Sequence, residues 1–191
     1  MNEVQLQAFL QRTLPPKRYR HSLGVADTAV QLARRYDADE ERAYLAGLLH
    51  DCAKPFSAAD MIQAAERLGM IVDEVYRASP QLLHGAAGAY RAREELGVQD
   101  EAVLHAICYH TIPDEKMGLL DRVVFVADMM EPNRNYPGVE ALRQAAGRSL
   151  EEAYLLSLER TIVHVAERRL PLHPASVTAY NRLLFQQLEK C

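Results

Sequence analysis

Hydrophobic positions recur with helical spacing along most of this chain of 191 residues. Leu6, Phe9 and Leu10, for example, fall at positions i, i+3 and i+4, which lie on one face of a helix. A longer helix is predicted over Tyr19–Tyr36, and a strongly apolar one over Leu119–Met130. No segment shows the sustained period-two alternation of a strand, and no Asn-Gly or Asp-Gly hairpin turn occurs. The pattern therefore predicts an all-α fold with eight to ten helices.

Proline, glycine and capping residues predict where these helices begin and end. Asp39 can cap a helix that runs through His50 and ends at Pro55. Near the C-terminus, the final amphipathic helix is expected over Ser176–Lys190. No internal repeat or long linker interrupts the series, so we expect one domain over residues 1–191. Its motif-bearing core spans about 17–134, and a C-terminal helical extension spans about 139–191.

Composition and charge exclude several classes of protein. The chain is 49% hydrophobic and 25% charged, as is usual for a globular protein, and its formal net charge is -4. That charge argues against a DNA or RNA partner and against a polybasic membrane patch. No apolar stretch approaches the length of a membrane span, no signal-peptide pattern opens the chain, and the three cysteines are widely spaced. We therefore expect a cytoplasmic protein without a disulfide framework.

The adjacent pair His50-Asp51 is the strongest chemical signal. It ends a run of small and apolar residues, Tyr44–Leu49, that should be buried, and a buried charge is costly unless it is paired or bound to a metal. Asp128 raises the same question, because it lies inside the apolar run V-V-F-V-A-D-M-M. Three further residues of metal-ligand type occur elsewhere: His21, His84 and His110. The simplest interpretation is a metal site drawn together from several helices.

Each of these residues also has a plainer interpretation. A lone helical histidine such as His21 is more often a surface or hydrogen-bonded residue, and Asp128 could cap a helix or form an ion pair. The small residues around His84 indicate either room for a ligand or tight helix packing. His105 and His110 share a helix but are five residues apart, so one could be a ligand and the other structural. His164 and His173 look structural or exposed.

Two cationic residues complete the set. Lys54 follows Asp51 by three residues, so it projects beside the pair, where a cation would hold a phosphate well. Its alternative is a solvated charge at a helix end. Arg134 has the planar fork that suits phosphate, and its alternative is a loop ion pair with Glu131. A purely structural helical protein would need Asp51 and Asp128 paired with cations, and no arginine or lysine is obviously placed in the sequence to do so.

The order of these residues resembles that of the HD-domain superfamily of metal-dependent phosphohydrolases. The finer resemblance is to the YqeK-like family, bacterial bis(5'-nucleosyl)-tetraphosphatases of the symmetrical type. The segments that carry the resemblance are R-H-S-L-G-V-A at 20–26, H-D-C-A-K at 50–54, H-G-A-A-G-A at 84–89, Y-H-T at 109–111 and A-D-M-M-E-P-N-R at 127–134. One departure is the loop I-P-D-E-K-M-G after Y-H-T, where Asp114 and Glu115 add negative charge near the expected phosphate site.

The resemblance implies an HD-type helical bundle with two metal ions, iron being the leading candidate before manganese, cobalt, nickel or zinc. By position, His21, His50, Asp51 and Asp128 would hold one metal, and Asp51 would bridge to a second one. The residues that would hold the second metal with Asp51 are His84 and His110. Imidazole and carboxylate ligands suit these transition metals better than calcium.

The implied reaction is symmetrical hydrolysis of diadenosine tetraphosphate to two ADP. A hydroxide that bridges the metals would attack phosphorus, and Asp51 and Lys54 would be the catalytic residues. Lys54, Arg134 and His110 would contact the dinucleoside polyphosphate. The alternatives are another HD-type nucleotidase or dNTP hydrolase, and a nucleotide sensor without hydrolytic activity. The exposed faces of the C-terminal helices could pair two copies in a homodimer or pack onto the same chain.

Overall fold

The computed structural model describes residues 1–189 and consists of helices, with no strand among those residues. In this described part of the chain, eleven α-helices and one 3₁₀ helix follow one another: α1 (Glu3–Thr13), α2 (Pro16–Tyr36), α3 (Glu40–Leu49), α4 (Ala58–Arg67), α5 (Glu74–Ala78), η1 (Pro80–Leu83), α6 (His84–Glu94), α7 (Glu101–Tyr109), α8 (Leu119–Met130), α9 (Val139–Arg148), α10 (Leu150–Glu167) and α11 (Pro174–Leu188). The all-α prediction is confirmed. The predicted count of eight to ten is too low, because short segments such as α5, capped by Asp73, form helices of their own.

Helix boundaries agree with the prediction where the apolar pattern is strong and differ where a turn intervenes. The helix predicted over Leu119–Met130 has those bounds. α2 begins at Pro16, three residues earlier than predicted, because proline suits the first turn of a helix. α3 ends at Leu49, and the prediction that it continues to Pro55 is wrong. His50 and Asp51 therefore lie in the turn that follows the helix. The predicted end of the last helix, at Lys190, lies outside the described residues.

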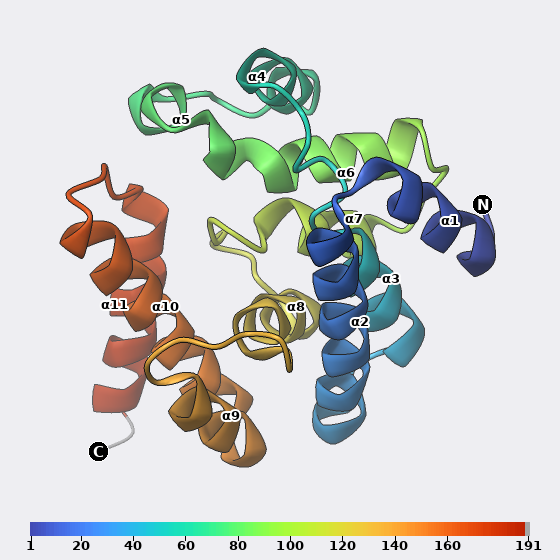
Figure 1. Cartoon of the computed structure of the whole chain (residues 1–191). Coiled ribbons are helices and arrows are strands. Elements are labelled where there is room, and N and C mark those ends of the chain that lie inside the picture. The colour runs from blue at the N-terminus through green and yellow to red at the C-terminus, as the bar shows by residue number, and fades with distance from the viewer. Residues whose placement is uncertain (190–191) are drawn as a thin grey trace.

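α8 is the central element of the fold. α2 and α7 pack against it on one side, and α9 and α10 pack on the other (Figure 1). Buried residues of α8 belong to two hydrophobic clusters. Phe125 is in a cluster with residues of α2, α9 and α10, and Val124 is in a cluster with residues of α1, α3 and α7. Asp128 immediately follows these buried residues of α8, so it lies where the helices of the two clusters meet. Among residues 1–189, no helix is long and apolar enough to cross a membrane.

Small residues bring the helices that carry the histidines into close contact. A Cβ atom added to Gly85 in α6 would lie 2.5 Å from the carbonyl oxygen of Cys108 in α7. In the same way, a Cβ atom on Gly47 in α3 would lie 2.9 Å from the Cα atom of Ala26 in α2. Both distances are shorter than real Cβ contacts allow, so the glycines are required for close packing. Tight packing therefore explains the small residues around His84.

Candidate metal centre

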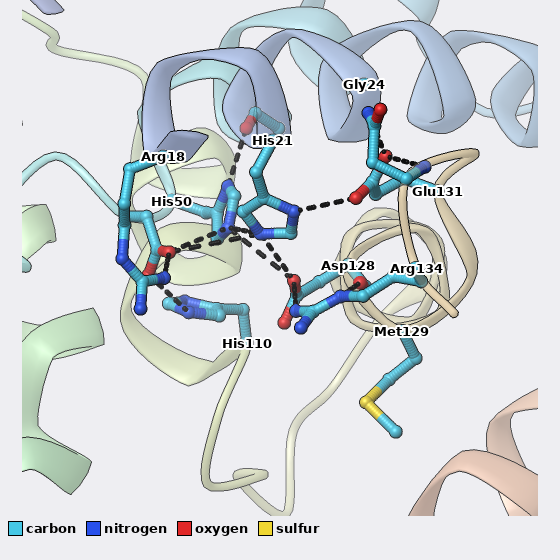
Figure 2. A network of polar contacts seen from close by, with 12 residues as sticks. Arg18, His21, Gly24, His50, His110, Asp128, Met129, Glu131 and Arg134 are labelled. Carbon is cyan, nitrogen blue, oxygen red and sulfur yellow. Dashed lines mark hydrogen bonds and ion pairs between the residues drawn. The ribbon is translucent and has the colours of Figure 1, made fainter. Parts of the chain in front are cut away.

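The six residues predicted as metal ligands converge at one buried point, where five segments of the chain meet. His21 comes from α2, His50 and Asp51 from the turn after α3, His84 from the start of α6, His110 from the residue after α7, and Asp128 from α8. Figure 2 shows His21, His50, His110 and Asp128 pointing toward one another. Their ligand atoms, with those of Asp51 and His84, form three overlapping groups within 4.8 Å, each of which could hold a metal ion.

Hydrogen bonds orient three of the four histidines in the same way. In His50, His84 and His110, the Nδ1 atom donates a hydrogen bond to a backbone carbonyl three residues earlier. The acceptors lie at 2.7 Å for His50 (Gly47), 2.6 Å for His84 (Gln81) and 2.8 Å for His110 (Ile107). Because a carbonyl can only accept, the proton is on Nδ1, and the lone pair of Nε2 faces the centre. This tautomer and orientation are those of a metal-binding histidine.

His21 is oriented by a carboxylate instead of a carbonyl. Its Nδ1 atom lies 3.1 Å from Oε1 of Glu131, which is buried just after α8. The second carboxylate oxygen, Oε2, accepts hydrogen bonds from the backbone N–H of Asn133 at 2.7 Å and from its Nδ2 at 2.8 Å. Gly24 leaves room for this group, since a Cβ atom there would lie 2.5 Å from Oε2 (Figure 2). Glu131 was not among the predicted site residues, although it belongs to the quoted E-P-N-R segment.

Asp51 divides its two oxygens between two pairs of histidines. Oδ2 lies 3.9 Å from Nε2 of His21 and 3.7 Å from Nε2 of His50. Oδ1 lies 3.2 Å from Nε2 of His84 and 3.9 Å from Nε2 of His110. Oδ1 is also buried without a hydrogen-bond partner of acceptable geometry. A buried carboxylate oxygen in that condition is costly unless a cation satisfies it, so the donor set fits two metal ions that share Asp51.

Asp128 lies on the side of the first histidine pair. Its Oδ1 atom is 2.9 Å from Nε2 of His21 and 3.7 Å from Nε2 of His50, and its side chain is 17% exposed. The structure therefore places Asp128 with the residues that the resemblance assigns to the first metal.

Three cations line the exposed rim of the centre. Arg18 lies 2.5 Å from Oδ2 of Asp51, and Arg134 lies 2.5 Å from Oδ1 of Asp128. Nζ of Lys54 is 3.6 Å from Oδ1 of Asp51. The expectation that no arginine or lysine is placed to pair with the two aspartates is therefore wrong. Arg18 was missed because it is 33 residues from Asp51 in the sequence, although it stands one helical turn before His21.

The contacts of Arg134 and Lys54 differ from the plainer alternatives given for them above, a loop ion pair and a solvated charge. Arg134 pairs with Asp128 and not with Glu131. Lys54 is not a solvated helix-end charge, because Nζ lies 2.9 Å from Nε2 of His84 and its side chain is 27% exposed. The guanidinium groups of Arg18 and Arg134 are more open, at 41% and 38% exposure, so solvent weakens both of their ion pairs.

Electrostatics give Asp51, Asp128, His50 and His110 the protonation states that metal ligands need. Burial alone would raise the pKa of Asp51, but His50, His84 and Lys54 hold it well below its usual value. Burial also opposes ionisation of Asp128, yet His21 and Arg134 lower its pKa well below the ordinary range. Burial lowers the pKa of His50 and, more strongly, that of His110. At neutral pH, the two carboxylates are therefore charged and these two imidazoles are neutral.

The remaining histidines take no part in the centre. Nδ1 of His105 lies 2.8 Å from Oδ1 of Asp121, so the structural member of the pair with His110 is His105. His173 caps α11 and lies 3.2 Å from a carboxylate oxygen of Asp73. His164 is exposed. The centre also includes a hydroxyl that was not predicted, since Oγ1 of Thr111 is 3.0 Å from Nε2 of His84.

Comparison with known proteins identifies the family. The model of the HD domain matches residues 18–168, most of the chain. This protein is a member of the HD domain family. All six candidate metal ligands lie within the matched residues, and HD domains bind divalent metals. The resemblance inferred from the sequence is thereby confirmed at the level of the superfamily.

Curated relatives confirm the finer resemblance. The chain is 38% identical over 187 residues to "Bis(5'-nucleosyl)-tetraphosphatase, symmetrical" of Halalkalibacterium halodurans, covering 98% of this chain and 100% of that one. It is also 38% identical to the protein of the same name from Bacillus subtilis, covering 96% and 98%. A solved structure from Clostridium acetobutylicum, described as a predicted HD superfamily hydrolase involved in NAD metabolism, has a TM-score of 0.93 and 39% identity. That match covers 97% of this HD protein and 98% of the other chain.

Proposed function

We propose that this protein is a metal-dependent hydrolase that cleaves diadenosine tetraphosphate symmetrically into two ADP. The observation that carries the proposal is the division of the Asp51 oxygens between two histidine pairs, which supports a site for two metals. The identity of the substrate is inferred from the similarity to symmetrical tetraphosphatases over nearly the full length of both chains. The geometry alone supports hydrolysis of a phosphoester or phosphoanhydride.

In this proposal, the first metal is held by His21, His50, Asp51 and Asp128, and the second by Asp51, His84 and His110. Iron is the first candidate, with manganese, cobalt, nickel and zinc as alternatives, because all accept imidazole and carboxylate ligands. When bound, two such ions supply positive charge that attracts polyphosphate and lowers the pKa of a water molecule. Asp51 would act catalytically as the ligand that both metals share.

The cations at the rim would bind the substrate. Lys54 and Arg134 are close enough to the two aspartates to contact a phosphate chain at the centre, and they would balance the charge that develops on its oxygens. Arg18 lies on the same rim and would add a third positive group. Charge-assisted hydrogen bonds of this kind are strong, and the planar fork of an arginine matches phosphate. His110 would also contact the substrate.

We also propose a domain organisation, a location and an oligomeric state for this protein. Residues 1–191 would form one domain, since α10 and α11 contribute Leu158 and Leu183 to the same core as α8. The net charge of -4 supports the absence of a DNA or RNA partner and is compatible with a cytoplasmic enzyme. A homodimer through the C-terminal helices would bury the exposed side chains of Phe185 and Leu188. Light scattering on the purified protein would measure that oligomeric state.

A product analysis tests the proposed function. The metal content of the purified protein is measured first, diadenosine tetraphosphate is added, and the nucleotides are separated by chromatography. ADP as sole product, with about two metal ions per chain, is the expected result. AMP with ATP would refute symmetrical cleavage. Turnover of mononucleotides or dNTPs in place of the dinucleotide would favour the other HD-type hydrolases, and binding without turnover would favour a nucleotide sensor. Asp51→Asn serves as the inactive control.

A further inference from the structure

Thr111, two residues after the end of α7, directs its hydroxyl into the metal centre. Its Oγ1 atom lies 3.0 Å from Nε2 of His84, and this hydroxyl makes no other hydrogen bond within residues 1–189. Thr13, Thr28 and Thr161 behave differently, because each donates its hydroxyl to the backbone carbonyl four residues earlier. The contact of Thr111 therefore does not serve its own helix.

Four groups surround Nε2 of His84, which has a single lone pair because Nδ1 carries the proton and donates it to a backbone carbonyl. Two of the four groups are donors: Oγ1 of Thr111 at 3.0 Å and Nζ of Lys54 at 2.9 Å. The other two are candidate metal ligands, Oδ1 of Asp51 at 3.2 Å and Nε2 of His110 at 2.9 Å. One lone pair cannot serve these donors and a metal ion at the same time.

Thr111 and Lys54 therefore lose their acceptor when a metal takes the lone pair of His84. The guanidinium groups of Arg18 and Arg134 differ in this respect, because both pair with carboxylate oxygens. Such an oxygen has more than one lone pair and can accept a hydrogen bond while it binds a metal. The hydroxyl and the ammonium group are thus the two donors of the centre that need a new acceptor in the metal-loaded protein.

A role of Thr111 in orienting His84 does not explain the contact. A partner that orients a metal-binding histidine contacts the ring nitrogen that does not bind the metal. In His84 that nitrogen is Nδ1, which already donates to the carbonyl of Gln81 at 2.6 Å. Thr111 contacts the other nitrogen, so its hydrogen bond and the metal–ligand bond exclude each other.

The second metal position has room for the new acceptor. Its candidate ligands are two imidazoles and one carboxylate, from His84, His110 and Asp51, and a ligand set of this kind leaves coordination positions open. A phosphate oxygen is the acceptor that the proposed reaction brings to this place. Hydrogen bonds from a hydroxyl and an ammonium group to such an oxygen are charge-assisted and strong.

We propose that Thr111 is a substrate-binding residue, whose hydroxyl donates, beside Lys54, to a phosphate oxygen at the second metal position. The proposal rests on the proposed function and adds a neutral donor to the cations that would contact the phosphate chain.

The test separates the hydroxyl of Thr111 from the shape of its side chain. Thr111→Val keeps the shape and removes the hydroxyl, whereas Thr111→Ser keeps the hydroxyl. Thr161→Val is the matched control, because Thr161 is also half-buried but donates within its own helix α10. Competition with a chelator measures metal affinity, calorimetry measures the affinity of the metal-loaded protein for pyrophosphate, and circular dichroism checks the fold.

In Thr111→Val we expect pyrophosphate affinity to fall by about tenfold or more, the usual effect of losing a hydrogen bond to a charged group, with metal affinity unchanged. Thr111→Ser should restore most of the pyrophosphate affinity, and Thr161→Val should change neither quantity. Unchanged pyrophosphate affinity in Thr111→Val would overturn the proposal. A loss of metal affinity would also overturn it, since that result is expected of a ligand or an orienting residue, and so would a serine variant that binds as weakly as the valine variant.

The role of Thr111 and the proposed reaction can fail separately. If Thr111→Val weakens pyrophosphate binding but the wild-type protein does not cleave diadenosine tetraphosphate, the phosphate contact stands and the proposed reaction falls. If the wild-type protein forms ADP while Thr111→Val binds pyrophosphate normally, the reaction stands and the role of Thr111 falls.

Discussion

Replacing Glu131 by glutamine should weaken metal binding although Glu131 is not a candidate ligand. The carboxylate serves two partners at once, because Oε1 faces Nδ1 of His21 while Oε2 accepts two hydrogen bonds from Asn133. A glutamine has only one acceptor oxygen in the same place. If that oxygen faces His21, the amide NH₂ meets the two donors of Asn133. If it faces Asn133, the NH₂ meets Nδ1 of His21.

The second arrangement changes the chemistry of the histidine. An NH₂ group can only donate, so Nδ1 of His21 must become the acceptor and the proton must move to Nε2. A protonated Nε2 cannot ligate a metal. Losing a partner that orients a metal-binding histidine typically costs 10–100-fold in metal affinity, which is about 1.4–2.7 kcal/mol. We expect Glu131→Gln to fall in that range.

Competition with a chelator measures the metal affinity of the folded variant, and circular dichroism checks its fold. Glu159→Gln is the control, because Glu159 is exposed on α10. Gly24→Ala provides a second route to the same result, since its Cβ atom would displace Oε2 without changing any charge. Nitrogen NMR of His21 would report the tautomer directly. Metal affinity within twofold of wild type in a folded Glu131→Gln protein would refute the positioning role.

Further predictions concern the centre and the packing around it. Asp51→Asn should remove metal and activity together, and full turnover without metal would refute the mechanism. Lys54→Ala should retain metal, as elemental analysis can show, but lower turnover by roughly 10²-fold. Gly85→Ala should destabilise the fold by about 1–3 kcal/mol in urea denaturation, whereas Gly147→Ala, where a Cβ atom meets nothing within 4 Å, should not. A hydrogen bond to a carboxylate raises the pKa of His105 above 6.5, so its contribution to stability is complete below 6.5 and is lost as pH rises through the raised value. His105→Gln should flatten that pH dependence, and an unchanged profile would contradict it.

The helical class and the chemical types of the residues at the centre could be predicted from the amino-acid sequence. Apolar spacing is a local property of a helix, so Leu119–Met130 could be predicted with its bounds. The burial of the His50-Asp51 pair and the partial burial of Asp128 followed from the apolar runs around them, and a buried charge requires a partner. The resemblance then assigned the six residues by position. These inferences depend only on neighbours along the chain or on quoted motifs.

Which groups meet, and in what orientation, depends on how the helices pack in three dimensions. Arg18 reaches Asp51 across 33 residues, and no local pattern predicts such a contact. The choice between His105 and His110 depends on Asp121, which comes from another helix. The orientation of His21 depends on Glu131, 110 residues away. Periodicity specifies the direction of a side chain within its own helix, but the distance between side chains of different helices is set by packing, here by contacts as close as that at Gly85.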